Sequence, residues 1–162
     1  MPGYNRRVTA SSAAGVAGFW FSIVAASTLL NSLLLQTFSR FLGLPTGLTL
    51  TLVNDAIFVA LRGVEPQALA SLLGLIVDAL VVCLFLILAR KTFRNSRGAV
   101  AAGLAIYVID TAVFLMFSAV GALGEIPLRD VLLQALTLVV HVVGCVLLFR
   151  GWRSLSAARI PE

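Results

Sequence analysis

Long apolar stretches separated by short charged segments are the dominant pattern in this chain. Stretches with no more than one Asp, Glu, Lys or Arg run over 8–39, 41–61, 66–89, 98–124 and 131–149. A helix needs about 20 mainly apolar residues to cross a bilayer. Four of the stretches meet this requirement, and they predict spans at about 13–36, 67–89, 99–122 and 131–150. The pattern therefore predicts an all-α fold, a transmembrane four-helix bundle that makes up one integral membrane domain over 1–162.

The second stretch, 41–61, is ambiguous. Two glycines and a proline stand near its start, and Asn54 and Asp55 interrupt its apolar remainder. Only 48–61 is close to continuously apolar, and a stretch of about 10 to 14 residues is more typical of interfacial or re-entrant segments than of spans. We predict a short interfacial helix over 48–61, between the first and second spans. A fifth crossing of the membrane is the alternative.

The distribution of basic residues predicts the orientation. With four spans, one side of the membrane carries nine of the 12 basic residues: Arg6, Arg7, Arg90, Lys91, Arg94, Arg97, Arg150, Arg153 and Arg159. The other side carries Arg40, Arg62 and Arg129. The positive-inside rule then predicts that both termini are cytoplasmic. We expect the membrane to be the cytoplasmic membrane of a bacterium. Five spans would divide the same residues eight to four with the N-terminus outside, so the charge count favours four spans only modestly.

Composition agrees with a membrane protein. Hydrophobic residues make up 60% of the chain, charged residues only 12%, and the mean hydropathy is +1.04. The net charge of +5 does not indicate nucleic-acid binding, because the basic residues flank apolar stretches and form no soluble basic patch. The lipid bilayer is the one partner that the composition itself predicts.

Small residues predict which helix faces pack together. On the first span they recur every four residues, the small-xxx-small spacing that allows helix backbones to approach closely in lipid: Ala14, Gly18, Ser22 and Ala26. On the third span a mixed stripe with alternating spacings of three and four is expected to face the bundle: Ala99, Gly103, Tyr107, Asp110, Phe114, Phe117 and Gly121.

One titratable residue lies near the centre of each of the last three spans: Asp78, Asp110 and His141. A charged Asp at a helix centre costs about 2.5 to 3.5 kcal/mol on insertion scales, so these side chains are expected to turn inward and to meet. The polar cluster that we predict around them also includes Asn31, Tyr107, Gln134 and Thr137. Because the outer halves of the helices are the more polar, water would reach the cluster through a vestibule open to the outside. The alternative is that these groups only hydrogen-bond neighbouring helices together.

The residues do not support metal or cofactor chemistry. Cys83 and Cys145 are too far apart in sequence for a redox pair, and a single histidine excludes bis-histidine haem ligation within one chain. Known catalytic templates such as HExxH or a phosphate-cradling glycine loop are missing from the sequence. We therefore predict no metal, no cofactor and no enzymatic activity.

Four strings resemble those of small four-span bacterial membrane proteins without assigned activity: "FWFSIVAASTLLNSLL" (19–34), "GLTLTLVNDAI" (47–57), "AIYVIDTAVFL" (105–115) and "LLFRGWRSL" (147–155). The resemblance would cover most of the chain. It implies a four-span topology and no particular chemistry.

Two main functional hypotheses follow from the sequence, and a lipid-binding or lipid-modifying role at the outer vestibule is a third that has no dedicated residues. The first is a non-enzymatic accessory or scaffold protein that forms homo-oligomers or joins other membrane subunits through the small-residue stripe of the first span. The alternative is a proton-linked small transporter or sensor that uses Asp78, Asp110 and His141 at the membrane midplane. Four helices are few for an alternating-access carrier, so a transporter would need to dimerise.

Overall fold

The computed structural model describes residues 2–38, 47–49, 51, 67–121 and 128–158. Four long helices account for nearly all of them: α1 (Pro2–Phe38), α3 (Gln67–Phe93), α4 (Arg97–Gly121) and α5 (Leu128–Ala157). Each contains a segment long and apolar enough to cross a membrane: Ser12–Leu34, Leu72–Phe93, Arg97–Ala119 and Val131–Ala157. The predicted all-helical fold with four membrane-spanning helices is confirmed at this level.

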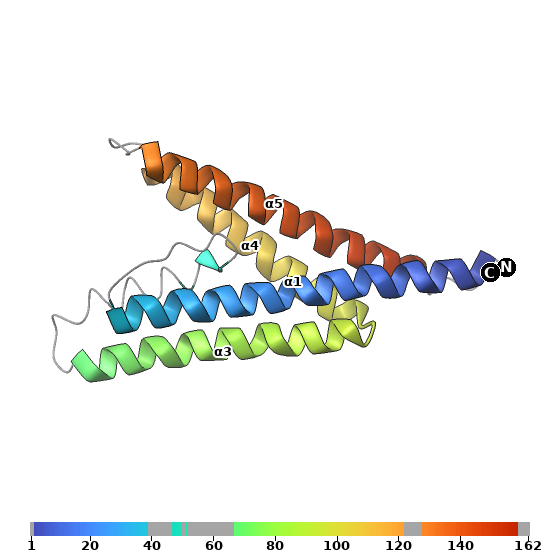
Figure 1. Ribbon diagram of the computed structural model, residues 1–162, viewed down its shortest axis with the longest axis horizontal. Helices are drawn as coiled ribbons and strands as arrows, with labels where there is room; N and C mark the ends of the chain where they lie inside the picture. The colour runs from blue at the N-terminus through green and yellow to red at the C-terminus, as the bar shows by residue number, and fades with distance from the viewer. Residues whose placement is uncertain (1, 39–46, 50, 52–66, 122–127, 159–162) are drawn as a thin grey trace.

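The four helices run alternately in opposite directions (Figure 1). The start of α1, the end of α5 and the turn between α3 and α4 lie at one end of the bundle, which we call the terminal end. α1 packs mainly against α3 and α5, and α4 packs mainly against α5. Toward the opposite end the α4–α5 pair diverges from the α1–α3 pair, and the short segment Gly47–Thr51 lies between α1 and α4 (Figure 1).

The tight turn between α3 and α4 is built from capping interactions. Asn95 adopts a left-handed backbone with φ of 58°, a conformation that Asn tolerates at the end of a helix. The Ser96 amide donates to the Lys91 carbonyl at 3.0 Å and the Asn95 amide to the Thr92 carbonyl at 2.8 Å, the two bonds of a Schellman motif. Ser96 then caps α4, since its hydroxyl accepts a 3.4 Å bond from the Ala99 amide. This turn makes α3 and α4 antiparallel neighbours.

The contact between α1 and α5 depends on two glycines of α5. A Cβ atom at Gly151 would lie 2.9 Å from the Cβ of Ala17, and one at Gly144 would lie 2.5 Å from the indole nitrogen of Trp20. Because these positions have no side chain, the two helices approach closely, as small residues allow in membrane bundles. Gly103 of α4 serves the same purpose against the ring of Phe21.

The small-residue stripe predicted on the first span lies only partly in the interface. Ala14 is 1% exposed and Gly18 faces the ring of Phe93 on α3, whereas Ser22 is half-buried and Ala26 is exposed. A four-residue spacing drifts by about 40° per step around a helix of 3.6 residues per turn, so the stripe turns out of the interface. One row of buried residues on α1 follows alternating spacings of three and four instead: Ala14, Ala17, Phe21, Val24, Thr28 and Asn31.

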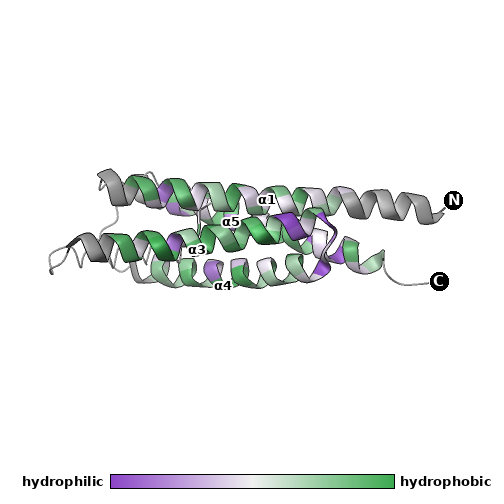
Figure 2. Ribbon diagram, turned by 90° about the horizontal axis from the view of Figure 1, so that it is seen from below, coloured by the Kyte–Doolittle hydropathy of each residue, from purple (hydrophilic) through white to green (hydrophobic). Residues whose placement is uncertain are grey.

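Large apolar side chains cover the outside of all four helices. Phe19 on α1, Leu80 on α3, Ile109 on α4 and Val139 on α5 are each more than half exposed. In Figure 2 the bundle is mostly green along its length, and hydrophilic residues gather at the terminal end. An apolar exterior of this extent is what a lipid environment requires.

The predicted interfacial helix over 48–61 falls mainly outside the described residues. Of that stretch the structure describes Leu48, Thr49 and Thr51, which are 2%, 8% and 3% exposed. These three residues are buried against the transmembrane helices. The interfacial helix itself stays a prediction.

Candidate functional site

The site forms where His141 of α5 inserts between aromatic rings of α4. Tyr107, Asp110 and Phe114 follow each other at spacings of three and four, so they share one face of α4. The imidazole stacks on Tyr107, with ring centroids 5.1 Å apart, and on Phe114, with centroids 5.5 Å apart. Between the two rings its Nε2 lies 3.1 Å from Oδ2 of Asp110. Both titratable side chains are 0% exposed.

The neighbours of the imidazole determine how many protons the pair carries. Nδ1 of His141 lies 2.9 Å from the Thr137 carbonyl, which can only accept, so Nδ1 carries a hydrogen. Nε2 faces a carboxylate oxygen, and the contact is favourable with one proton between them, on either atom. The pair is then an imidazolium with a carboxylate or a neutral imidazole with a carboxylic acid. Its net charge is zero in both forms, which suits the interior of a membrane protein.

Asp110 also binds the backbone of the Gly47–Thr51 segment. Its Oδ2 accepts a 3.1 Å hydrogen bond from the Thr49 amide. The preceding amide, that of Leu48, donates to the Thr28 hydroxyl of α1 at 3.2 Å. Thr49 and Thr51 are helical, and the first amides of a helix have no partner within it, so other protein groups must satisfy them at membrane depth. The segment therefore links α1 to α4 through two adjacent amides.

Asp78 lies on a different interface. Its Oδ2 accepts a 2.5 Å hydrogen bond from the Ser32 hydroxyl of α1, and its side chain is 1% exposed. The structure thus brings Asp110 and His141 together as predicted, and places Asp78 between α3 and α1.

The other predicted cluster residues are distributed unevenly around the pair. Tyr107 stacks on His141, and Asn31 is buried on α1 at 1% exposure. Thr137 contributes its carbonyl, while its hydroxyl donates to the Leu133 carbonyl at 2.8 Å. Gln134, one turn earlier on α5, is half-buried. The predicted vestibule is not seen at the pair, because both of its side chains are fully buried and the Thr49 backbone lies on Asp110.

Three contributors were missed by sequence reasoning. Phe114 was placed on the bundle-facing stripe of the third span, but it was not identified as the second ring that stacks on His141. Thr28 and Thr49 bind through a hydroxyl and a main-chain amide, and a backbone donor leaves no signal in the residue type. The glycine and proline content before Leu48 was the available signal that the chain is not helical at Gly47 and Leu48.

Trp20 of α1 also contacts the aromatic rings around His141. Its ring meets Tyr107 edge to face, with centroids 6.4 Å apart. Gly144 of α5 lies beside both rings, since a Cβ atom there would be 2.5 Å from each. The indole nitrogen of Trp20 and the hydroxyl of Tyr107 are buried and have no hydrogen-bond partner among the described residues. Trp20 is therefore a natural spectroscopic reporter on this site.

Metal ligands do not converge in the part of the chain that the structure describes, where no three His, Cys, Asp or Glu residues come together. Cys145 lies 3.8 Å from the Thr111 hydroxyl, and Cys83 is exposed on α3.

Comparisons with protein-family models, curated proteins and solved structures found no significant match to this chain. The resemblance to small four-span bacterial membrane proteins stays a prediction, and the functional argument rests on the site itself.

Proposed function

We propose that this chain is a proton-linked sensor or small transporter of a bacterial cytoplasmic membrane, with no enzymatic activity. The observation that carries the proposal is the fully buried Asp110–His141 pair, whose carboxylate also holds the Thr49 backbone. Intramembrane titratable residues are rare and are typical of proton-dependent function. Asp78 has no role in this proposal because its carboxylate is bonded to Ser32.

The chemistry of the pair supplies the switch. Loss of the shared proton leaves a carboxylate facing the lone pair of Nε2, and these groups repel. Gain of a second proton makes Asp110 a neutral acid beside an imidazolium, and the acid accepts more weakly from the Thr49 amide than a carboxylate does. Either change weakens the contact between α4 and α5 or the bond to Thr49. The Gly47–Thr51 segment is then the element whose position responds to proton binding.

The accessory or scaffold role is the second candidate. The small-residue stripe on α1 suggested this role, but part of it packs against other helices of the same chain, because Gly18 packs against Phe93 and Ala14 is buried. What supports it in the structure is the exposed part of α1, where Ala26 and Phe19 are free to contact another membrane protein.

A fluorescence titration tests the proton-linked proposal. The chain has two tryptophans, so Trp152→Phe leaves Trp20 as the single reporter. The ring of Trp20 contacts Tyr107, which stacks on His141. We expect the emission of this variant in lipid nanodiscs to change with pH. Adding Asp110→Asn or His141→Gln should abolish the change, because neither variant retains the shared proton.

Asp78→Asn in the same background is the matched control, since it removes the buried carboxylate that accepts from Ser32 and leaves both residues of the pair in place. It should keep the pH response. A response that survives Asp110→Asn would remove this residue from the mechanism. If emission and proton flux into vesicles are both independent of pH in the parent protein, the proton-linked proposal fails and the scaffold candidate is favoured.

A further inference from the structure

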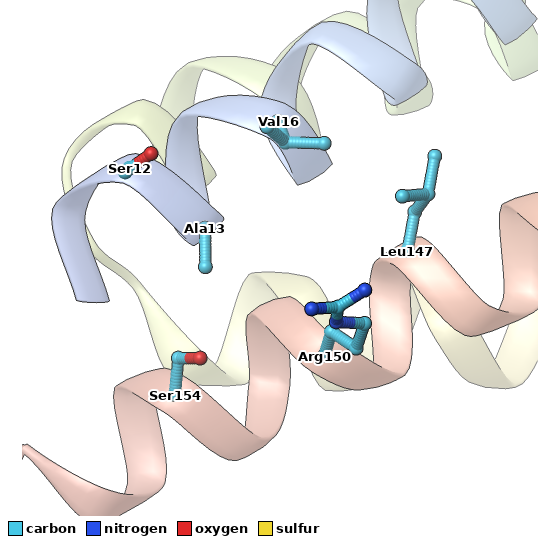
Figure 3. Close-up of a pocket in the computed structure, with 6 residues that line it drawn as sticks. All are labelled: Ser12, Ala13, Val16, Leu147, Arg150 and Ser154. Carbon is cyan, nitrogen blue, oxygen red and sulfur yellow. The ribbon is translucent and has the colours of Figure 1, made fainter. Parts of the chain in front are cut away.

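A groove separate from the Asp110–His141 pair opens between α1 and α5 near the terminal end. Its volume is about 420 Å³, within the usual range for small-ligand pockets. Three residues of α1 and three of α5 line it: Ser12, Ala13, Val16, Leu147, Arg150 and Ser154. Figure 3 shows the Arg150 guanidinium reaching into the space between the two helices.

The lining changes in polarity along the helices. Ser12 and Ser154 lie toward the terminal end, and Val16 and Leu147 lie toward the middle of the bundle, with Arg150 between them (Figure 3). Val16 is 45% exposed, so the apolar half of the groove is open to lipid. A ligand that fits this gradient has a polar, negatively charged head and an apolar tail.

Among the described side chains, no carboxylate lines the groove to balance the charge of Arg150. Among residues with described side chains the carboxylates are Asp78 and Asp110, and both are buried in other contacts. Arg150 shares the terminal end with Arg90, Lys91, Arg94 and Arg97. The described residues therefore leave Arg150 available to an anion from outside the chain.

We propose that this groove binds an anionic phospholipid, with the headgroup phosphate on Arg150 and an acyl chain along Val16 and Leu147. Basic pockets between transmembrane helices are suited to anionic headgroups, and Ser12 and Ser154 offer hydroxyl donors to phosphate oxygens. The close approach of α1 and α5 at Ala17 and Gly151 holds the two walls in place. This site is independent of the proton-linked proposal.

Native mass spectrometry of the delipidated full chain tests the assignment. Phosphatidylglycerol and phosphatidylcholine with identical acyl chains are added back in turn, and the bound lipid is counted. We expect phosphatidylglycerol to bind preferentially and Arg150→Gln to reduce its affinity about fivefold. Ser154→Leu, which fills the groove without changing charge, should reduce binding as well.

Arg153→Gln is the matched control, because it removes the same charge from the same helix at an exposed position outside the groove. It should leave phosphatidylglycerol binding close to that of the parent protein. Equal losses in the Arg150 and Arg153 variants would overturn the proposal, as would equal binding of the two lipids. Displacement of bound phosphatidylglycerol by inorganic phosphate alone would also overturn it, since the groove would then be a site for a free anion.

Discussion

Asp110 and His141 place two titratable side chains among four apolar helices without adding net charge. The rings of Tyr107 and Phe114 cover both faces of the imidazole, an arrangement that stabilises a cation by about 0.5 to 2 kcal/mol. Replacing a buried ion pair with apolar residues is often neutral for stability, whereas removing one partner is costly. The pair should therefore behave as a unit.

A double-mutant cycle measures this coupling. Asp110→Leu and His141→Leu should each destabilise the protein by about 3 to 5 kcal/mol, because each leaves a buried partner without its counterpart. The double variant should lose less than the sum, with a coupling of about 1 to 3 kcal/mol. Unfolding free energies in micelles provide the measurement. Additive losses would show that the two side chains act separately.

The depth of the titratable residues was predictable, but the separation of Asp78 from the Asp110–His141 pair was not. Hydrophobic stretches locate residues along the membrane normal, which placed Asp78, Asp110 and His141 at similar depths. Contact also depends on which helices are neighbours, and α1 lies between α3 and α5 in the packing. Ser32 of α1 is therefore the partner within reach of Asp78. The order of the helices around a bundle cannot be read directly from a single sequence.

At the scale of the helices, α5 meets α1 through glycines that the sequence reading did not single out. Gly144 and Gly151 are seven residues apart and face Trp20 and Ala17 respectively. The buried residues of α5 keep the same spacing of three and four: His141, Gly144, Leu148, Gly151 and Leu155. The stripe predicted on the first span was a four-residue repeat, and a search for such repeats does not detect the pattern of Gly144 and Gly151.

Gly144→Ala tests the α1–α5 contact. The added methyl would lie 2.5 Å from Trp20 and from Tyr107, so the rings must move. We expect a loss of about 1 to 3 kcal/mol, as for other overpacked interiors. Gly15→Ala on α1 is the control, because nothing lies within 4 Å of a Cβ there. It should be neutral or stabilising by up to about 1 kcal/mol. Equal thermal shifts in the two variants would contradict the packing argument.

For the whole molecule, the four antiparallel helices bring the start of α1, the end of α5 and the α3–α4 turn to one end (Figure 1). The turn and its flanks carry Arg90, Lys91, Arg94 and Arg97, and the guanidinium of Arg97 lies 5.3 Å from the centre of the Trp152 ring. We expect this end to be cytoplasmic, because positively charged loops are retained on that side.

Cysteine labelling tests the orientation. In a background with Cys83 and Cys145 replaced by Ser and Ala, Arg94→Cys should react with a membrane-impermeant maleimide only in inside-out vesicles. Leu128→Cys, which is 74% exposed at the opposite end, should react only in right-side-out vesicles. Labelling of both positions from one side would contradict the antiparallel span order, and the reverse pattern would contradict the orientation.

The bond from the Thr49 amide to Asp110 joins residues 61 positions apart in the chain. During synthesis Thr49 leaves the ribosome well before Asp110 has been made, so its amide does not yet have this acceptor. Leu48 can already bind Thr28, which is made earlier. We therefore expect the segment to bind α1 first and α4 later. In a chain truncated before α4 the bond from Leu48 to Thr28 can form, whereas the bond from Thr49 to Asp110 cannot.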